Sequence, residues 1–367
     1  MDDEVRATGL DPASDRASRR RRGRRSPYHN ARQGADADPT DIPGPTYAAL
    51  DLGTNNCRLL VARATRDGFH VIDAFSRIIR LGEGITASGR LSDAAIGRAV
   101  EALRICRAKM KNRGVTRHRL IATEACRLAE NGNEFLGRVH EQVGIELEIV
   151  DRETEARLAA TGCTPLIDPQ ADGVILFDIG GGSSELVRLG RSVRTHMGPP
   201  EPEIRAWVSL PVGVVTLAER YGGFAVNREL FEAMIAEVAA FVEKFAAQYG
   251  GSIDGLHLLG TSGTVTTIAG VHLALPRYER RYVDGCWLSD VQVSGVVERL
   301  LAMSYDERVA NPCIGSERAD LVLAGCAILE AIRRSFPCER LRVADRGLRE
   351  GMLVQMMRED KVWGVAP

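Results

Sequence analysis

Three short turns of the sequence combine glycine with small polar side chains, each directly after an apolar run. They are Gly53-Thr54-Asn55-Asn56, Gly180-Gly181-Gly182-Ser183-Ser184 and Gly260-Thr261-Ser262-Gly263-Thr264. A phosphate oxygen needs several N–H or O–H donors close together, and glycine lets a backbone approach that closely. The third turn also precedes a predicted helix, whose N-terminus adds partial positive charge. Any one of these turns alone would be an ordinary tight turn, but together the three predict a site that binds phosphate groups.

Two of the turns follow an aspartate that ends an apolar strand pattern. Tyr47–Asp51 precedes the first turn, and Val174–Asp178 precedes the second. Two carboxylates beside phosphate groups are suited to bind Mg²⁺, usually in part through water. The alternative is that each aspartate caps its own turn. Because the arrangement occurs twice, we predict that Asp51 and Asp178 are metal ligands.

A short acidic segment, residues 151–158, carries a candidate catalytic base. Glu155 would lie on a helix expected over Glu153–Thr161, from which its carboxylate could take a proton from an attacking water. By composition alone, the segment is also an ordinary helix start, where glutamate is favoured near the positive end of the helix dipole. Arg127 follows the strand pattern His118–Ala122 and would clamp a phosphate, although most arginines lie on the surface.

The elements that must position these residues repeat once along the chain. The unit of strand, aspartate, polar turn and strand recurs after 127 residues, from Asp51 to Asp178, which is the length of a domain rather than of a solenoid repeat. We therefore interpret the chain as two related α/β domains, residues 46–165 and 166–367, with the ligand cleft between them and a C-terminal helix that could pack back on the first domain. Helices are expected at Ser92–Arg113, Asn227–Tyr249, Ser289–Met303 and Ser316–Ser335.

The composition is that of a globular protein, with 44% hydrophobic and 26% charged residues. None of the eight cysteines stands in a CxxC spacing, so the sequence encodes neither a zinc ribbon nor a thioredoxin-type redox site. No apolar secretory segment opens the chain, and its most apolar stretch, Leu321–Leu329, is too short to cross a bilayer. We expect a cytoplasmic protein with no membrane partner, in which the thiols serve as small core residues.

Residues 1–45 differ in composition from the rest of the chain. They hold nine Arg and eight Asp or Glu, yet the charges are segregated, with eight Arg and no acid from Arg16 to Arg32. The segment has no apolar period that would repay the entropy of ordering it, so we predict a disordered N-terminal extension. It could contact a polyanion such as RNA or another acidic partner. An inert, solvated extension is the alternative.

Between Tyr47 and about Met357, the chain resembles the exopolyphosphatase and guanosine pentaphosphate phosphatase family of the sugar-kinase, heat-shock-chaperone and actin superfamily. The resemblance rests on blocks that occur in family order and span nearly all of the chain after the N-terminal segment. These blocks are Asp51–Arg58, Thr123–Arg127 with Asn131, Glu155–Leu158, Asp178–Glu185, Leu210–Gly213, Gly260–Thr264, Glu317–Asp320 and Asp345–Gly351.

The resemblance implies two tandem ribonuclease-H-like domains of the actin-like ATPase kind, with the active site in the interdomain cleft. It implies hydrolysis of the terminal phosphoanhydride bond of inorganic polyphosphate or of guanosine pentaphosphate, a nucleotide of the stringent response. Glu155 would be the catalytic residue, and Mg²⁺ or Mn²⁺ would be held near Asp51, Asp178 and Glu185. The three turns would grip successive phosphates, with Arg127 on an equatorial oxygen. If the chain assembles, a homodimer is the expected oligomer.

Two positions depart from the family pattern. Asn56 stands where the family usually has serine, and Ser184 stands where threonine is common. Ser184 keeps a hydroxyl, and the amide of Asn56 can still donate a hydrogen bond. The departures therefore bear on phosphate geometry more than on the class of reaction. Larger relatives add a helical C-terminal domain, and we expect only the two catalytic-fold domains here.

Two other functions are consistent with parts of the sequence. A nucleotide-driven ATPase or kinase of the same superfamily would use the same turns. Those relatives hold adenosine with a Gly-Gly motif followed closely by proline, and no proline follows Gly260–Thr264 in residues 265–270. A non-catalytic scaffold could bind RNA or another polyanion through the Arg-rich segment, but it would not need intact site residues. No residue identified so far reads guanine, so the choice between polyphosphate and guanosine pentaphosphate is left open.

Deleting residues 1–45 should raise KM for long-chain polyphosphate at low salt while turnover stays intact. A long polyanion would be attracted to the eight clustered arginines, and this attraction should weaken steeply as salt rises. Guanosine pentaphosphate is compact, so its KM should change much less. The measurement is KM for both substrates with full-length and truncated protein at low and high salt. Equal KM values for polyphosphate at low salt would leave the segment without a role in substrate capture.

Overall fold

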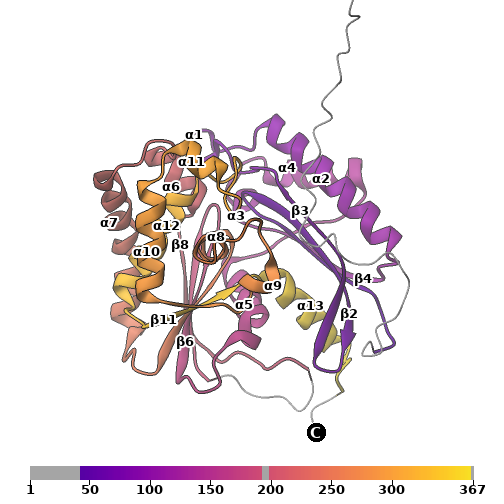
Figure 1. Cartoon of the computed structure of the whole chain (residues 1–367). Coiled ribbons are helices and arrows are strands. Elements are labelled where there is room, and N and C mark those ends of the chain that lie inside the picture. The colour runs from indigo at the N-terminus through magenta and orange to yellow at the C-terminus, as the bar shows by residue number, and fades with distance from the viewer. Residues whose placement is uncertain (1–41, 192–197, 365–367) are drawn as a thin grey trace, which may run out of the picture.

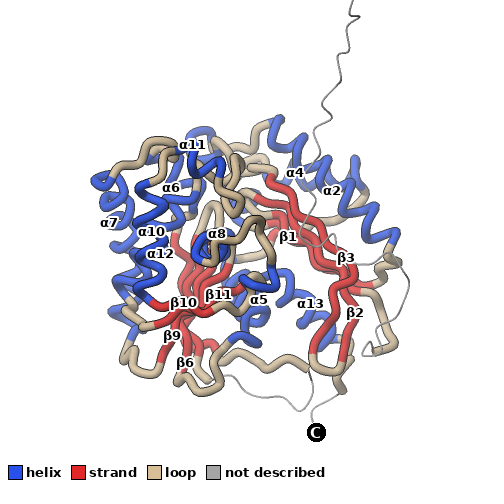
Figure 2. Tube along the Cα trace, viewed as in Figure 1, coloured by secondary structure: helices blue, strands red, loops and turns tan. Residues whose placement is uncertain are grey.

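The computed structural model describes residues 42–191 and 198–364, so nearly all of the Arg-rich extension predicted at residues 1–45 lies outside the described residues. Two sheets face each other, each covered by helices on its outer side, and two further helices lie between them (Figure 1, Figure 2). All eight cysteines are free thiols, and seven of them are buried. Within the described ranges, none of the helices combines the length and the apolar character that a bilayer crossing needs.

The first sheet begins with the hairpin that carries the first polar turn. Its order is β3-β2-β1-β4-β5, with β1, β2 and β3 antiparallel and β1, β4 and β5 parallel. β1 lies between two neighbours and is buried on both faces, which explains why its sequence is a continuous apolar run. The elements of this half are β1 (Tyr47–Leu52), β2 (Asn56–Thr65), β3 (Gly68–Ile78), α1 (Ile85–Ser88), α2 (Asp93–Asn112), β4 (Arg117–Ala122), α3 (Glu124–Leu128), α4 (Gly132–Val143) and β5 (Glu148–Ile149).

The second sheet repeats this plan. Its order is β10-β11-β9-β6-β7-β8, and again an antiparallel meander of three strands is followed by parallel strands, here β9 beside β6 and β11 beside β9. The duplicated unit predicted from the sequence is thus present as β1-β2-β3-β4 and β6-β7-β8-β9. The elements are β6 (Gly173–Ile179), β7 (Ser184–Leu189), β8 (Ile204–Leu210), α6 (Val214–Tyr221), α7 (Arg228–Phe245), β9 (Leu256–Thr261), α8 (Gly263–His272), α9 (Arg280–Val283), β10 (Trp287–Ser289), α10 (Asp290–Ala302), α11 (Tyr305–Ala310), α12 (Val322–Ser335) and β11 (Arg340–Ala344).

Of the helices expected at Ser92–Arg113, Asn227–Tyr249, Ser289–Met303 and Ser316–Ser335, the first three are confirmed as α2, α7 and α10. The fourth prediction placed the helix start too early, because α12 begins at Val322, six residues later than expected. The residues before it form turns, in which the carbonyl of Ala319 accepts a hydrogen bond from Arg308 and that of Glu317 accepts one from Arg80. These contacts come from distant parts of the chain, and local sequence does not reveal them.

The two helices between the sheets are α5 (Arg152–Cys163) and α13 (Leu348–Glu359). Each buries one apolar face on a different sheet, so together they join the two halves (Figure 1). The residues of α5 on the second sheet are Ala156, Ala160 and Cys163, and those of α13 on the first sheet are Met352, Leu353, Met356 and Met357. The C-terminal helix therefore packs on the first sheet although it follows the last strand of the second.

Glycine lets α5 and α13 cross in close contact. A Cβ on Gly162 would lie 2.0 Å from the carbonyl oxygen of Gly347, and a Cβ on Gly351 would lie 1.9 Å from the carbonyl oxygen of Leu158. Both distances are far below van der Waals contact, and both neighbours are backbone atoms that cannot swing aside. Any larger residue would push the two helices apart.

Gly162→Ala should lower the free energy of unfolding by about 1–3 kcal/mol, the usual range for an overpacked core. Gly137→Ala is the matched control, since Gly137 lies in α4 and a Cβ there would have no neighbour within 4 Å. That variant should be unchanged or more stable by up to about 1 kcal/mol, because alanine favours the helix. Urea unfolding of both variants is the measurement, and equal midpoints would contradict the role assigned to the crossing.

Candidate active site

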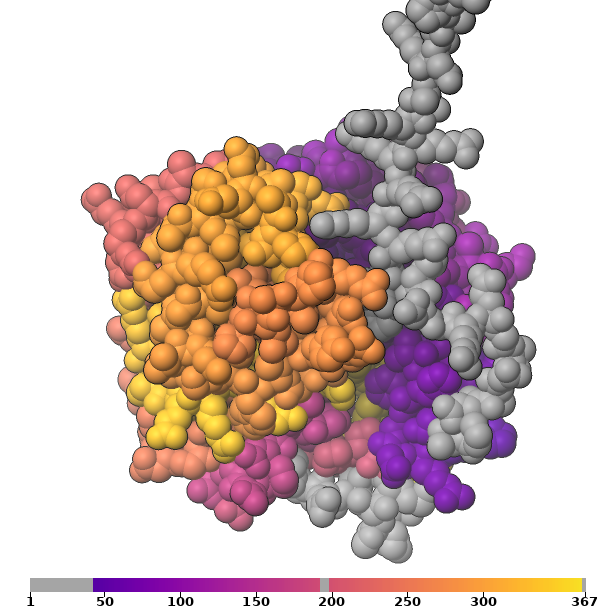
Figure 3. Space-filling model, in the orientation of Figure 1, coloured from indigo at the N-terminus to yellow at the C-terminus, as the bar shows by residue number. Residues whose placement is uncertain are grey.

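A cleft of ≈ 1980 Å³ is lined by residues of both sheets and of the interdomain helices. In the space-filling view, the orange and yellow residues of the second half and the indigo residues of the first half form blocks that face each other (Figure 3). All three polar turns reach the cleft: the first joins β1 to β2, the second joins β6 to β7, and the third leads from β9 into α8. The predicted site residues line the cleft, apart from Arg127, Ser184 and Gly260.

The first two turns touch each other between the domains. A Cβ on Gly181 would lie 2.9 Å from Cβ of Thr54, and one on Gly182 would lie 3.0 Å from Oγ1 of Thr54. Within residues 42–191 and 198–364, the backbone N–H groups of Thr54, Asn55, Gly181 and Gly182 have no protein acceptor. Unpaired N–H groups from two facing turns are what a phosphate oxygen requires.

The side-chain amide oxygens of the first turn also lack hydrogen-bond partners. The Oδ1 atoms of Asn55 and Asn56 are buried and accept no hydrogen bond in the described part of the chain. A buried polar atom without a partner is unfavourable unless a ligand or a water satisfies it. Asn56, the residue that departs from the family pattern, therefore lies where its side chain could bind a polar ligand.

The third turn is held in a strained conformation. Ser262 has φ 84°, in the left-handed region that favours glycine, and its hydroxyl donates to the carbonyl of Ile179 at 2.6 Å. This bond ties the third turn to the end of β6, next to the second turn. The following residue, Gly263, begins α8, so the unpaired N–H groups of a helix start face the same cleft.

Four carboxylates face the cleft, and burial raises the pKa of each of them. Burial raises the pKa of Asp51, and burial with repulsion from Asp51 raises the pKa of Asp178 to about 6. Burial and the charge of Asp178 raise the pKa of Glu185 to about 7, although the hydroxyls of Ser183 and Ser209 donate to it. The pKa of Glu155 is raised well above its usual value by burial and by Glu185. This cluster favours bound protons or a bound cation.

The carboxylates of the cleft fit a metal site that water and substrate complete, and they do not fit a site made of protein ligands alone. Among the described residues, no three acidic, histidine or cysteine side chains lie close enough to hold a metal ion by themselves. Asp51, Asp178 and Glu185 therefore do not form a ready-made cage. Mg²⁺ commonly binds through one or two carboxylates and completes its shell with waters and substrate phosphates. Separated carboxylates around a phosphate-binding cleft fit that arrangement.

Arg127 does not lie where the sequence analysis placed it. The prediction was a phosphate clamp, but the guanidinium donates to Glu124, to the carbonyl of Val150 and to Glu155, and it does not line the cleft. An arginine with three protein acceptors has little left for a phosphate. Its place beside Glu155 depends on chain segments that the sequence alone could not bring together.

Ser184 and Gly260 support the turns and do not line the cleft. Ser184 is fully buried and donates to the carbonyl of Val212 at 2.7 Å. Gly260 is a residue of β9, where a Cβ would lie 2.5 Å from the ring of Phe177. The prediction that both bind phosphate directly is therefore corrected: both fit into the packing beneath the turns.

Two arginines that the sequence analysis did not single out face the cleft. Arg58 lies on β2, and Arg318 lies in the turns before α12. In the part of the chain that the structure describes, neither side chain forms a hydrogen bond or an ion pair. Burial and the charge of Arg58 lower the pKa of Arg318. Both arginines lie in blocks of the family resemblance, and this was the signal in the sequence that could have identified them. A bound anion would relieve the repulsion between the two arginines.

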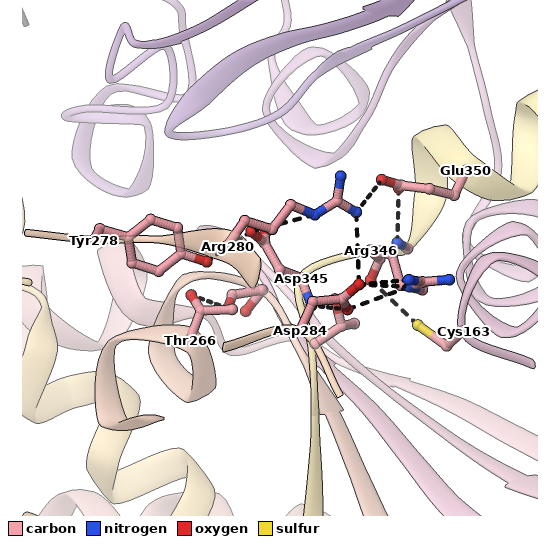
Figure 4. Close-up of polar contacts among 11 residues, drawn as sticks. Cys163, Thr266, Tyr278, Arg280, Asp284, Asp345, Arg346 and Glu350 are labelled. Atoms are coloured by element: carbon pink, nitrogen blue, oxygen red, sulfur yellow. Dashed lines mark hydrogen bonds and ion pairs between the residues drawn. The ribbon is translucent and has the colours of Figure 1, made fainter. Parts of the chain in front are cut away.

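A second cluster of charges lies farther along the cleft, where α9 meets the start of α13 (Figure 4). Arg280 forms ion pairs with Asp284, Asp345 and Glu350 at 4.0, 3.7 and 3.3 Å. Arg346 donates to Asp284 at 3.1 Å. The two arginines offset most of the charge of the three carboxylates, so the main effect of the cluster is to hold these elements together.

The backbone of Arg346 ties this cluster to the third turn. Its carbonyl accepts hydrogen bonds from the hydroxyl of Thr261 at 2.6 Å and from the thiol of Cys163 at 3.2 Å. Thr261 precedes the strained residue of the turn, and Cys163 ends α5. The third turn is thus fixed relative to the interdomain helices.

The chain is similar over most of its length to named proteins. A family model described as the Ppx/GppA phosphatase family matches residues 60–360. A curated relative from Aeromonas hydrophila, named guanosine-5'-triphosphate,3'-diphosphate pyrophosphatase, is 28% identical over 314 residues. The match covers 85% of this chain and 60% of that relative. A relative of the same name from Aeromonas salmonicida matches equally, so the chain spans about 60% of the length of these curated relatives.

Solved structures have the same fold. The crystal structure of the Ppx/GppA family member of Aquifex aeolicus superposes with a TM-score of 0.71 at 28% identity, over 86% of this chain and 98% of that one. An exopolyphosphatase from Cytophaga hutchinsonii superposes with a TM-score of 0.76 at 24% identity, again over 86% and 98%. The two-domain actin-like fold predicted from the sequence is confirmed.

Asp178→Asn should stabilise the protein at pH 8 and have little effect at pH 4. Since the pKa of Asp178 is about 6 in the folded protein, against about 3.9 in an unfolded chain, the folded state binds the proton more tightly. Ionisation therefore destabilises the folded state increasingly as the pH rises from about 4 through about 6, and the amide removes this loss. The gain should be about 3 kcal/mol above pH 7. Urea unfolding at both pH values without divalent cations is the measurement, and a gain that does not vary with pH would exclude this origin.

Proposed function

This chain belongs to the Ppx/GppA phosphatase family, and we propose that it hydrolyses the terminal phosphoanhydride bond of inorganic polyphosphate, of guanosine pentaphosphate, or of both. The observation that carries the proposal is the position of Glu155. Its carboxylate lines the same cleft as the unpaired N–H groups of the two facing turns, and it is close enough to Glu185 and Asp51 for their charges to raise its pKa. The names of the Aeromonas relatives support the same class of reaction.

Substrate binding would use groups from both domains. The N–H groups of the first two turns and the start of α8 would bind the oxygens of successive phosphates. Arg58 and Arg318, whose side chains form no hydrogen bond or ion pair among the described residues, would offset the negative charge of the phosphate chain. Because the donors come from both sides of the cleft, a bound phosphate chain would also hold the domains together.

Glu155 would act as the general base. A carboxylate with a raised pKa is a better proton acceptor near neutral pH than an ordinary one. Glu155 would take a proton from a water as that water attacks the terminal phosphorus opposite the bridging oxygen. The new P–O bond forms as the phosphoanhydride P–O bond breaks, so inorganic phosphate and the shortened chain are the products.

Asp51, Asp178 and Glu185 would hold Mg²⁺, or Mn²⁺ in its place, through one or two carboxylates and water. When bound, the ion would supply positive charge that offsets the charges of the phosphate chain and of the carboxylates. This role accounts for a cluster of acids at a site for a polyanion, which would otherwise repel its substrate.

The direct test is phosphate release from long-chain polyphosphate and from guanosine pentaphosphate, measured side by side with purified full-length protein and Mg²⁺. Release from either substrate supports the proposal, and the ratio of the two kcat/KM values defines the preference. Absence of release from both would overturn it.

Glu155→Gln should lower kcat by about 10² or more while substrate still binds, because the amide keeps the shape of the side chain but cannot accept the proton. Glu153→Gln is the matched control, since Glu153 lies on the same helix with an exposed side chain paired to Arg157. Its kcat and KM should equal those of the wild type. Turnover near the wild-type rate in Glu155→Gln would remove this residue from the mechanism.

A further inference from the structure

Glu124 is a buried carboxylate at the cleft that the proposed reaction does not use. It is 3% exposed, and its Oε1 accepts a hydrogen bond from Arg152 at 2.6 Å. Its Oε2 accepts one from Nε of Arg127 at 2.9 Å and a second from the same guanidinium. Burial alone would raise the pKa of Glu124, but the hydrogen bonds from Arg152 and Arg127 outweigh it and lower the pKa. Glu124 is therefore an ionised group shared by two cations.

These contacts hold Arg127 in one orientation. Its Nε and Nη2 face Glu124, and its Nη1 donates to the carbonyl of Val150. Nη2 also donates to Oε2 of Glu155 at 3.1 Å. Each nitrogen of the planar guanidinium is occupied, so the group cannot rotate toward Glu155 without losing a charge-assisted bond.

Glu155 depends on this arginine for the orientation of its carboxylate. Among the described residues, the bond from Arg127 is the one hydrogen bond that the Glu155 side chain accepts, and it uses Oε2. Oε1 has no protein donor there, so it is available to a water. The orientation of the Glu155 carboxylate therefore depends on the contacts that hold Arg127 in place.

Glu124 also contacts the phosphate-binding turn of the second domain. A Cβ on Gly182 would lie 3.0 Å from Cγ of Glu124. One continuous set of contacts therefore runs from the second turn through Glu124 and Arg127 to Glu155. Glu155 and the second turn are thereby held in a fixed relative position although they belong to different domains.

We propose that Glu124 is a positioning residue for the reaction proposed above: it holds Arg127 so that Arg127 fixes Oε2 of Glu155 and leaves Oε1 for the attacking water. The inference deepens the proposed function and rests on it. The charges of Glu124 and Glu155 balance those of Arg127 and Arg152. Without Glu124, Arg127 would be free to turn and to pair with both oxygens of Glu155, which would occupy the base.

Glu124→Gln should lower kcat about 10-fold or more and change KM less than about threefold, because the base is misplaced while the phosphate-binding groups are kept. Glu153→Gln removes the same charge from an exposed position on α5 that does not contact Arg127, and it should leave both constants unchanged. A folded Glu124→Gln protein with wild-type kcat would overturn the proposal.

A double-mutant cycle separates positioning from a general structural role. If Glu124 acts through Arg127, the variant with both Glu124→Gln and Arg127→Gln should be no slower than Arg127→Gln alone. Losses of kcat that multiply would show that Glu124 acts in another way. If Glu124→Gln does not fold, Glu124→Asp is the variant that tests the positioning role. Its shorter side chain keeps the charge but should not reach both arginines. That variant should lose kcat at unchanged KM, and a wild-type kcat would overturn the proposal.

Glu155→Gln, assayed in parallel, distinguishes the two proposals. If Glu155→Gln is inactive and Glu124→Gln has the wild-type kcat, the positioning role fails and the proposed function stands. If the wild-type protein releases phosphate from neither substrate, both fail.

Discussion

The close crossing of α5 and α13 determines how the two domains meet. Gly162 and Gly351 lie against backbone carbonyls of the opposite helix, so the two helices approach to a distance that no side chain would allow. Each helix buries its other face on one of the sheets, and the separation of the sheets follows from the crossing. Glu155 stands in the first turn of α5 and lines the cleft, so the same contact that joins the domains also sets the position of the proposed base.

Polar contacts outside the crossing of α5 and α13 also join the two domains. Arg80 donates to both carboxylate oxygens of Asp320 at 2.8 and 3.0 Å, and the N–H of Gly84 donates to Glu219 at 2.9 Å. Arg80 takes a φ of 47° to make this contact, an unfavourable angle for a residue with a side chain. The two domains are thus joined by apolar packing at α5 and α13 and by these polar groups.

The distribution of charge in the cleft is unfavourable for the protein alone and suited to a ligand. Asp178 and Glu185 repel each other and have raised pKa values, while the side chains of Arg58 and Arg318 face the same space without a hydrogen bond or an ion pair among the described residues. A phosphate chain with a divalent cation would satisfy both sets at once. The contrast with the cluster around Arg280 is informative, because there each charge is paired and the result is structural. Stability and binding are assigned to different groups of charged residues.

The repeated unit of the fold and the turns that line the cleft follow from local features of the sequence. β1 and β6 are recognisable because a strand buried on both faces must be continuously apolar, and the glycine-containing turns because only certain residues allow such a backbone. These preferences act within a few residues. The same reasoning placed Glu155 on a short helix after β5, where the structure has it.

The direction and the partners of the long charged side chains depend on tertiary packing and could not be predicted from local sequence. Arg127 pairs with Glu124 and Glu155, whereas Arg58 stays unpaired within the described ranges, and no local feature of the sequence distinguishes the two arginines. The late start of α12 has the same origin, since Arg80 reaches its preceding turns from the other domain. The physical reason is that a long side chain can take many rotamers of similar free energy. Its rotamer is then selected by the charges that the packing of distant segments brings near the side chain.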